Sequence, residues 1–364
     1  MSEDIELIRE SSEATPAWLT RVLHGSGALP TSATVTDVRA EQFAQGSGLL
    51  SELFRLTPTY EGGHGPATLV LKLPTSEPSM RGVADALGLY ARELRFYREL
   101  APTAPFETAA CHVALADGTG TTTDFVLVLE DLAHRTPLDQ VVGCDWEQAN
   151  AVIDRLADFH AQWWGHDRLP ELATTFLPAA NPMYVAVLPQ LYGPGWVVAR
   201  EVAADLLTDD LRAFGDRWAD LCGAMLEAIM EPTTLIHGDW RSDNLFLDGD
   251  RLTVIDFQIV GTATGVSDLA YFVSQSLEPE VSHGRNRELC DGYVRRMADR
   301  GVELEPEQAW RQYRLALCFC LTYPVTVFQS WDDLPDRGRD LVRSMLRRAL
   351  AAIHDADALA VLPA

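Results

Sequence analysis

The sequence predicts an α+β protein with a small β-rich lobe over residues 1–132 and a larger, mainly helical lobe over residues 133–364. Three observations predict this class. Five strand-like patterns and one helical pattern fill residues 34–132. The pattern changes after Leu132. From there on, most segments repeat their apolar residues at the spacing of an α-helix.

The β-rich lobe is expected to hold a five-stranded antiparallel sheet and one helix. Apolar residues spaced near 3.6 predict the helix over residues 83–100. The strands are expected in residues 34–60 (two strands around a Gly46-Ser47-Gly48 turn), 66–74, 111–118 and 123–132. Their short turns favour antiparallel neighbours.

The helical lobe begins with a clear start signal, because Asp145 is a good N-cap for a helix over residues 146–164. The Pro-, Tyr- and Trp-bearing residues 170–198 read as a loop-rich insertion. Residues 233–258 predict a short strand, a loop and a hairpin that turns at Asp248-Gly249-Asp250. Further helices are expected over residues 200–230 and most of 266–354.

Composition excludes several classes of protein. With 47% hydrophobic residues, 23% charged residues and 364 residues in all, the chain is globular rather than disordered. Its net charge of −24 argues against nucleic acid and anionic membrane as partners. The same charge mildly favours a cationic substrate, although a uniformly acidic surface is the simpler and preferred explanation.

Cysteine usage and the first residues indicate a cytoplasmic protein. The six cysteines lack zinc-finger spacing, so they are expected to be reduced thiols. The opening MSEDIELIRE has no apolar core of a secretory signal, and the uncharged stretch 315–328 is too short to span a bilayer.

Lysine is almost absent: of the 29 basic residues 28 are Arg, and the single Lys is Lys72. A coding bias towards Arg could leave one lysine by chance. The alternative is that this position needs a compact ammonium group, which a planar guanidinium cannot replace.

The strongest candidates for catalytic and metal-binding residues lie in residues 237–256. Asp239 and Asn244 are five apart on a polar loop, and Asp256 follows the apolar run LTVI. Phosphoryl transfer from MgATP needs a carboxylate that orients the acceptor hydroxyl, and an amide oxygen with a second carboxylate for Mg²⁺. An Asx-rich turn and a capping carboxylate would explain each residue separately, but not the three in this order.

The β-rich lobe adds a candidate phosphate site. Gly46-Ser47-Gly48 lies between two strands, where backbone N–H groups could hold phosphates, although Gly25-Ser26-Gly27 is a similar triplet. Lys72 on the third strand could pair with phosphates and be oriented by a helix carboxylate. Glu93 is the first candidate for that carboxylate and Glu99 the second.

Over residues 35–355 the sequence resembles the aminoglycoside phosphotransferase superfamily. The resemblance rests on the motifs HGDWRSDN and IDFQ, on Lys72 and Glu93, and on the LVLEDL strand. Members of this superfamily are small-molecule kinases with a two-lobed, protein-kinase-like fold. The runs ELRFYRELAP and HAQWW resemble its ecdysteroid-kinase-like branch. The resemblance implies an ATP-binding lobe over 1–132, and a catalytic loop and acceptor site in 133–364.

The resemblance implies roles for individual residues. Asp239 would be the base or hydroxyl positioner, and Asn244 and Asp256 would bind Mg²⁺. Arg241 would neutralise charge on the transferring phosphoryl group, unless it is a surface arginine paired with Asp243. His237 and Asp268 would support the loop.

For the nucleotide, the resemblance implies that Lys72 contacts the α- and β-phosphates of ATP and pairs with Glu93. Gly46, Ser47 and Gly48 would lie at the phosphates. Backbone groups near Glu130, Asp131 and Leu132 would meet the adenine.

The expected partner is a small molecule with a hydroxyl group, such as an antibiotic, a hydroxy acid, a sugar or a steroid-like alcohol. Tyr184 and Trp240 are the candidates to contact it. The residues DFQ at 256–258 replace the DFG of protein kinases, and no activation loop follows, which argues against a protein substrate. Two alternatives stay open: a choline or amino-alcohol kinase, and a nucleotide-binding scaffold without activity.

Overall fold

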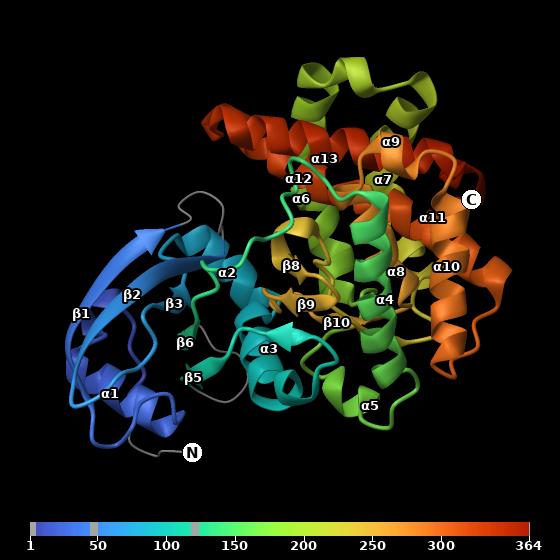
Figure 1. The fold of residues 1–364 in the computed structure, drawn as a ribbon. Coiled ribbons are helices and arrows are strands. Elements are labelled where there is room, and N and C mark those ends of the chain that lie inside the picture. The colour runs from blue at the N-terminus through green and yellow to red at the C-terminus, as the bar shows by residue number, and fades with distance from the viewer. Residues whose placement is uncertain (1–4, 44–49, 118–123, 364) are drawn as a thin grey trace. The chain divides into compact units, whose positions relative to one another are not determined.

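The computed structural model describes residues 5–43, 50–117 and 124–363. The chain divides into two compact units (Figure 1). The N-terminal unit comprises residues 1–104 and 108–136, and the C-terminal unit comprises 105–107 and 137–364. Each unit is described by itself.

The N-terminal unit is built on an antiparallel sheet of five strands in the order β1-β2-β3-β6-β5, which confirms the predicted sheet. The strands are β1 (Thr34–Phe43), β2 (Ser51–Glu61), β3 (Leu69–Pro74), β5 (Cys111–Ala116) and β6 (Phe125–Glu130). In Figure 1 the long pair β1–β2 curves beside helix α1 (Pro16–Gly25), a helix that is not among those expected from the sequence.

The two faces of this sheet have different roles, because successive side chains of a strand point to opposite sides. Leu69, Leu71 and Leu73 of β3 belong to the apolar core that α1 helps to form. Lys72 lies between them in sequence and therefore points to the other face. Its neighbours across the ladder are Leu53 of β2 and Leu127 of β6.

The helix predicted over 83–100 is interrupted. The segment forms α2 (Pro78–Ala86), α3 (Leu89–Arg95) and the π-helical turn η2 (Phe96–Leu100). Gly88 separates α2 from α3 with φ +64°, a conformation that glycine adopts without strain. A regular helix would have placed Glu93 differently on its surface, so the break matters for the site.

The C-terminal unit is mainly helical. Its longer helices are α4 (Trp146–Trp163), α6 (Pro182–Val202), α7 (Asp209–Ala228), α8 (Val266–Ser276), α10 (Asn286–Asp299), α11 (Pro306–Cys320) and α13 (Asp336–Asp355). Shorter ones are α5 (Leu169–Leu172), α9 (Pro279–Ser282) and α12 (Thr322–Val327). Helix α8 packs against α11, α13 and α10. Asp145 caps α4 by accepting from the N–H of Gln148, as its sequence predicts.

Short 3₁₀ turns join several of these elements. They are η1 (Ser11–Glu13), η3 (Ala101–Thr103), η4 (Ala204–Leu206), η5 (Ser242–Asn244), η6 (Phe328–Asp333) and η7 (Ala358–Val361). The small strands are β4 (Glu107–Thr108), β7 (Thr234–Ile236), β8 (Leu245–Asp248), β9 (Arg251–Val254) and β10 (Gly261–Ala263). The hairpin β8–β9 turns at Gly249 and Asp250, which confirms the predicted turn.

The expectation of a loop-rich insertion over 170–198 is wrong, because residues 182–198 belong to the 21-residue helix α6. Asn181 caps this helix by accepting from the N–H of Met183, and Pro182 is suited to its first turn. Two internal prolines suggested a loop, but the stacked rings of Tyr192, Trp196 and Trp218 hold the helix against α7. Tertiary packing here outweighs local propensity.

All six cysteines are free, and burial raises the pKa of Cys111 to about 12. Among residues 5–43, 50–117 and 124–363, no helix is both long and apolar enough to cross a bilayer.

Candidate active site

The hairpin β8–β9 brings Asn244 and Asp256 to the same end. Leu245 pairs with Val254, so Asn244 and Ile255 stand opposite one another, and the N–H of Ile255 donates to the carbonyl oxygen of Asn244 at 3.1 Å. Asp256 follows directly, with φ +65°. A positive φ is uncommon for a residue with a side chain and is often found at functional sites.

The loop that carries Asp239 is held at its start by Asp268 of α8. The carboxylate of Asp268 accepts from the backbone N–H of His237 at 2.6 Å and from that of Gly238 at 2.9 Å. Gly238 has φ +82°, and a Cβ atom there would lie 2.6 Å from the carbonyl oxygen of Ile259. This close approach to backbone requires glycine.

His237 links the two ends of the site. Its Nδ1 accepts from the N–H of Asp239 at 3.2 Å, which leaves Nε2 to donate to the carbonyl oxygen of Ile255 at 3.1 Å. Burial lowers the pKa of His237, because a charged imidazolium would lose its hydration there. The neutral ring therefore ties the loop to the strand end that precedes Asp256.

The Asp239 carboxylate lies among hydrogen-bond donors. Its Oδ1 accepts from the Tyr271 hydroxyl at 2.5 Å and from Arg241 Nε at 2.9 Å, and its Oδ2 accepts from Asn244 Nδ2 at 2.8 Å. Burial alone would raise the pKa of Asp239. The charge of Arg241 and the hydrogen bond from Tyr271 outweigh it, so the pKa lies below the ordinary value. Asp239 is therefore ionised at neutral pH.

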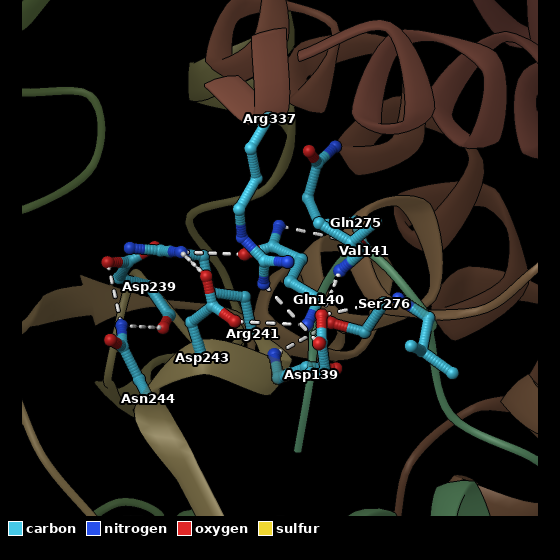
Figure 2. Close-up of polar contacts among 12 residues, drawn as sticks. Asp139, Gln140, Val141, Asp239, Arg241, Asp243, Asn244, Gln275, Ser276 and Arg337 are labelled. Atoms are coloured by element: carbon cyan, nitrogen blue, oxygen red, sulfur yellow. Dashed lines mark hydrogen bonds and ion pairs between the residues drawn. The ribbon is translucent and has the colours of Figure 1, made fainter. Parts of the chain in front are cut away.

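Arg241 has three acceptors, Asp239, Gln140 and Asp243, which Figure 2 draws around it. Besides Asp239, its Nη1 donates to Gln140 Oε1 at 2.6 Å and lies 3.4 Å from a carboxylate oxygen of Asp243. Burial would lower the pKa of Arg241, but the carboxylate of Asp239 raises it overall. The guanidinium thus stays positively charged. It contacts Asp239 and Gln140 as well as Asp243, so it is not simply a surface arginine paired with Asp243.

Gln140 is fully buried and is itself anchored on several sides. Its backbone N–H donates to Asp243 Oδ1 at 3.0 Å, and its Nε2 donates to the carbonyl oxygen of Gln275 at 3.3 Å. The buried Arg348 of α13 donates to the carbonyl oxygens of both Gln140 and Gln275. The position of Arg241 is therefore fixed by the interior of the unit.

The chemistry of Asn244 and Asp256 fits Mg²⁺. Asn244 donates through its amide nitrogen to Asp239, so its amide oxygen is the atom suited to a metal, and Asp256 supplies a carboxylate. Within the described ranges, no group of three or more His, Cys, Asp or Glu side chains could hold a metal ion. These two oxygen ligands would bind Mg²⁺ together with phosphate oxygens and water, which is how Mg²⁺ is usually held.

In the N-terminal unit, Lys72 and Glu93 form a buried ion pair. Lys72 Nζ lies 2.9 Å from Oε1 and 2.7 Å from Oε2 of Glu93, and the two side chains are 9% and 2% exposed. Glu93 belongs to α3, while Glu99 lies in η2 and pairs with Arg95. The structure therefore selects Glu93 over Glu99 as the partner of the single lysine.

The segment predicted to meet adenine ends strand β6. Glu130 accepts through a side-chain oxygen from the N–H of Ala110 at 3.2 Å. Asp131 pairs with Arg55 at 2.6 Å, and the side chain of Leu132 is buried. The predicted phosphate residues Gly46, Ser47 and Gly48 lie outside the described residues.

The two predicted acceptor contacts lie in different surroundings. Trp240 is fully buried and packs against Phe106 and His237, which makes it a core residue of the unit rather than a surface for a solute. Tyr184 lies on α6 and is partly exposed.

Sequence reasoning missed two residues of this site, Tyr271 and Gln140. Tyr271 is three residues after Asp268 and thus about one turn further along α8, so its approach to the loop could have been inferred from Asp268. Gln140 lies about 100 residues before Arg241, and no sequence pattern connects them.

A family model described as "Phosphotransferase enzyme family" matches residues 53–314. It confirms the resemblance seen in the sequence. No curated protein sequence matches the chain.

Two solved structures share the fold. The choline kinase of Cryptosporidium parvum has a TM-score of 0.56 and 10% identity, covering 94% of this chain and 97% of its own. The GDP and kanamycin complex of APH(2″)-IIIa has a TM-score of 0.52 and 14% identity, covering 94% and 99%. The predicted fold of a small-molecule kinase is confirmed.

Proposed function

The chain belongs to the phosphotransferase enzyme family, and from this premise we propose that it transfers the γ-phosphate of ATP to a hydroxyl group of a small molecule. The observation that carries the proposal is the ionised Asp239, held by Tyr271, Arg241 and Asn244 beside two oxygen ligands for Mg²⁺. This set of groups is the one that phosphoryl transfer from MgATP requires.

Asp239 receives the acceptor. A substrate hydroxyl donates its hydrogen bond to Oδ2, which accepts from Asn244, whereas Oδ1 already accepts from both Tyr271 and Arg241. The hydroxyl oxygen forms a bond to the γ-phosphorus while the bond between that phosphorus and the β–γ bridging oxygen breaks. The hydroxyl proton passes to Asp239. Because the pKa of Asp239 is lowered, it orients the hydroxyl first and takes the proton late.

Two basic residues act on the phosphates. Arg241 neutralises negative charge on the transferring group, since its guanidinium is held in place by Gln140 and stays charged. Lys72, oriented by Glu93, binds the α- and β-phosphates. When bound by Asn244 and Asp256, Mg²⁺ would neutralise further phosphate charge.

An amino alcohol is the second candidate acceptor, because the choline kinase structure shares the fold. A nucleotide-binding scaffold without turnover is the third reading. The intact set of Lys72, Asp239, Asn244 and Asp256 argues against it.

The test is release of ADP from MgATP across a panel of sugars, hydroxy acids, sterols, amino alcohols, aminoglycosides and macrolides. We expect acceptor-dependent release that falls by at least 100-fold in Asp239→Asn, an isosteric change that removes the proton acceptor. Binding of MgATP with no acceptor-dependent release on the whole panel would overturn the proposal. It would favour the scaffold.

A further inference from the structure

One stripe of helix α6 stays partly exposed although it is apolar. Tyr184, Leu188, Leu191 and Gly195 are spaced by four, three and four residues, so they share one face of the helix. Gly195 is buried against α12: a Cβ atom there would lie 1.9 Å from the carbonyl oxygen of Val325. The stripe therefore faces α12, and its other three residues are only half-buried.

The start of α12 leads from this stripe to Asp239. Tyr323 lies in α12, and its ring centre is 4.1 Å from that of Tyr271, the residue that donates to Asp239. Burial is the main cause that raises the pKa of Tyr323, and the neighbouring Asp239 and Tyr184 add to it. The helix that the stripe faces thus reaches Asp239 through Tyr271, on the Oδ1 side of the carboxylate, and the acceptor hydroxyl would approach the neighbouring Oδ2.

The stripe and α12 carry no charged side chain. Two carboxylates, Asp332 and Asp333, lie on η6, which packs against α6 and α12, and both are exposed. Residues 172–199 contain no Asp, Glu, Lys or Arg, and neither does α12. The charge of Asp239 is matched by Arg241 at 2.9 Å. An ammonium group placed against the stripe would lose water without gaining a buried carboxylate from α6 or α12, which is unfavourable.

Resting on the proposed function, we propose that the acceptor is a neutral, largely apolar alcohol. Its carbon skeleton lies against Tyr184, Leu188, Leu191 and Tyr323, and its hydroxyl group reaches Asp239. Ring-bearing skeletons suit this surface best, because the two tyrosines offer aromatic faces and edges to pack against. Apolar contact area supplies the affinity and Asp239 the orientation.

The acidic net charge of −24 does not oppose this assignment. It describes the whole surface and acts on encounter, whereas selection among bound acceptors depends on the groups that replace water at the site.

The experiment compares kcat/KM for neutral ring-bearing alcohols (2-phenylethanol, 2-cyclohexylethanol) with that for cationic acceptors (ethanolamine, choline, kanamycin). We expect the neutral class to be favoured by at least 10-fold. Leu188→Asp places a carboxylate in the stripe. It should lower kcat/KM for the neutral alcohols by at least 10-fold and raise it for ethanolamine, with an unchanged KM for ATP.

Met183→Asp is the matched control, since Met183 is 43% exposed on another face of the same helix. It should leave both kcat/KM values within about twofold of the unmodified protein. Leu188→Asn is the milder variant in case the aspartate weakens folding. It should lower kcat/KM for the neutral alcohols and leave kcat/KM for the cationic acceptors unchanged.

The outcomes separate the two proposals. Preference for the cationic acceptors, or equal effects of Leu188→Asp and Met183→Asp, would overturn the apolar acceptor and leave the kinase standing. No turnover of either class would overturn the apolar acceptor, whereas the kinase is overturned only if the wider acceptor panel is silent as well.

Discussion

Gln140 offers a sharp test of how Arg241 is held. Replacing Gln140 by Met keeps the length of the side chain but removes the oxygen that accepts from Arg241 Nη1 at 2.6 Å. The backbone contacts of residue 140 with Asp243 and Arg348 do not depend on its side chain. The variant therefore removes one of the three acceptors of the guanidinium, together with the donor from Gln140 Nε2 to the carbonyl oxygen of Gln275, and leaves the surrounding backbone anchored.

The magnitude follows from the kind of hydrogen bond that is lost. A hydrogen bond to a charged group contributes about 1.5–3 kcal/mol. Each 1.36 kcal/mol in the barrier changes a rate about tenfold. If Arg241 must be in place in the transition state, kcat of Gln140→Met should fall by about 10- to 150-fold while KM for ATP stays within about threefold.

The assay is steady-state kinetics with saturating acceptor, on Gln140→Met, Arg241→Met and the double variant. Because Gln140 acts through Arg241, the double variant should be no slower than Arg241→Met alone. Gln275→Met is the matched control. Gln275 is equally buried, and its side chain donates to Ser274 rather than to Arg241. A kcat of Gln140→Met near that of the unmodified protein, or losses that multiply in the double variant, would refute the reasoning.

Two other contacts give predictions of the same kind. Tyr271→Phe removes one donor to Asp239, so the pKa of Asp239 should rise and the acidic limb of the kcat/KM profile should move to higher pH. An unmoved limb would contradict this. Lys72→Met removes the ammonium group that pairs with the buried Glu93 carboxylate. It should lower the free energy of unfolding, measured in urea, by about 3–5 kcal/mol, whereas the double variant Lys72→Met with Glu93→Leu should recover most of the loss. Additive losses in that double variant would argue against a direct pair.

The pH dependence of stability has a definite sign at Asp239. Its pKa is below the ordinary value in the folded protein, so its ionisation stabilises the fold above that ordinary value. This contribution is lost as the pH falls towards the folded-state pKa. The stability difference between Tyr271→Phe and the unmodified protein should therefore shrink in acid.

The parts of the fold that depend on neighbouring residues could be predicted from the sequence. The turn at Gly249 and Asp250 and the cap at Asp145 are set by residues a few positions away, and both were predicted. Lys72 could be picked out because it is the only lysine. The break at Gly88 shows the limit, because apolar spacing alone does not reveal where a helix is interrupted.

Features that depend on distant packing could not be predicted. Helix α6 contains Pro189 and Pro194, whose local preference is against a helix, and its packing against distant parts of the chain, such as Trp218 of α7, outweighs that preference. Gln140 is positioned beside Arg241 by its contacts with Gln275 of α8 and Arg348 of α13, and no sequence pattern predicts these contacts. Trp240 illustrates the same limit, since a position beside Asp239 in sequence does not decide whether the ring faces a ligand or the core.

The most direct test of the central claim follows the phosphoryl group itself. ATP labelled with ¹⁸O on the γ-phosphate is incubated with Mg²⁺, the protein and 2-phenylethanol, and the products are analysed by mass spectrometry. The account predicts a phosphate monoester that carries three labelled oxygens with the alcohol's own unlabelled oxygen as the bridge, formed at least 100-fold more slowly by Asp239→Asn. Labelled inorganic phosphate as the only product, or an ester formed equally fast by Asp239→Asn, would contradict it.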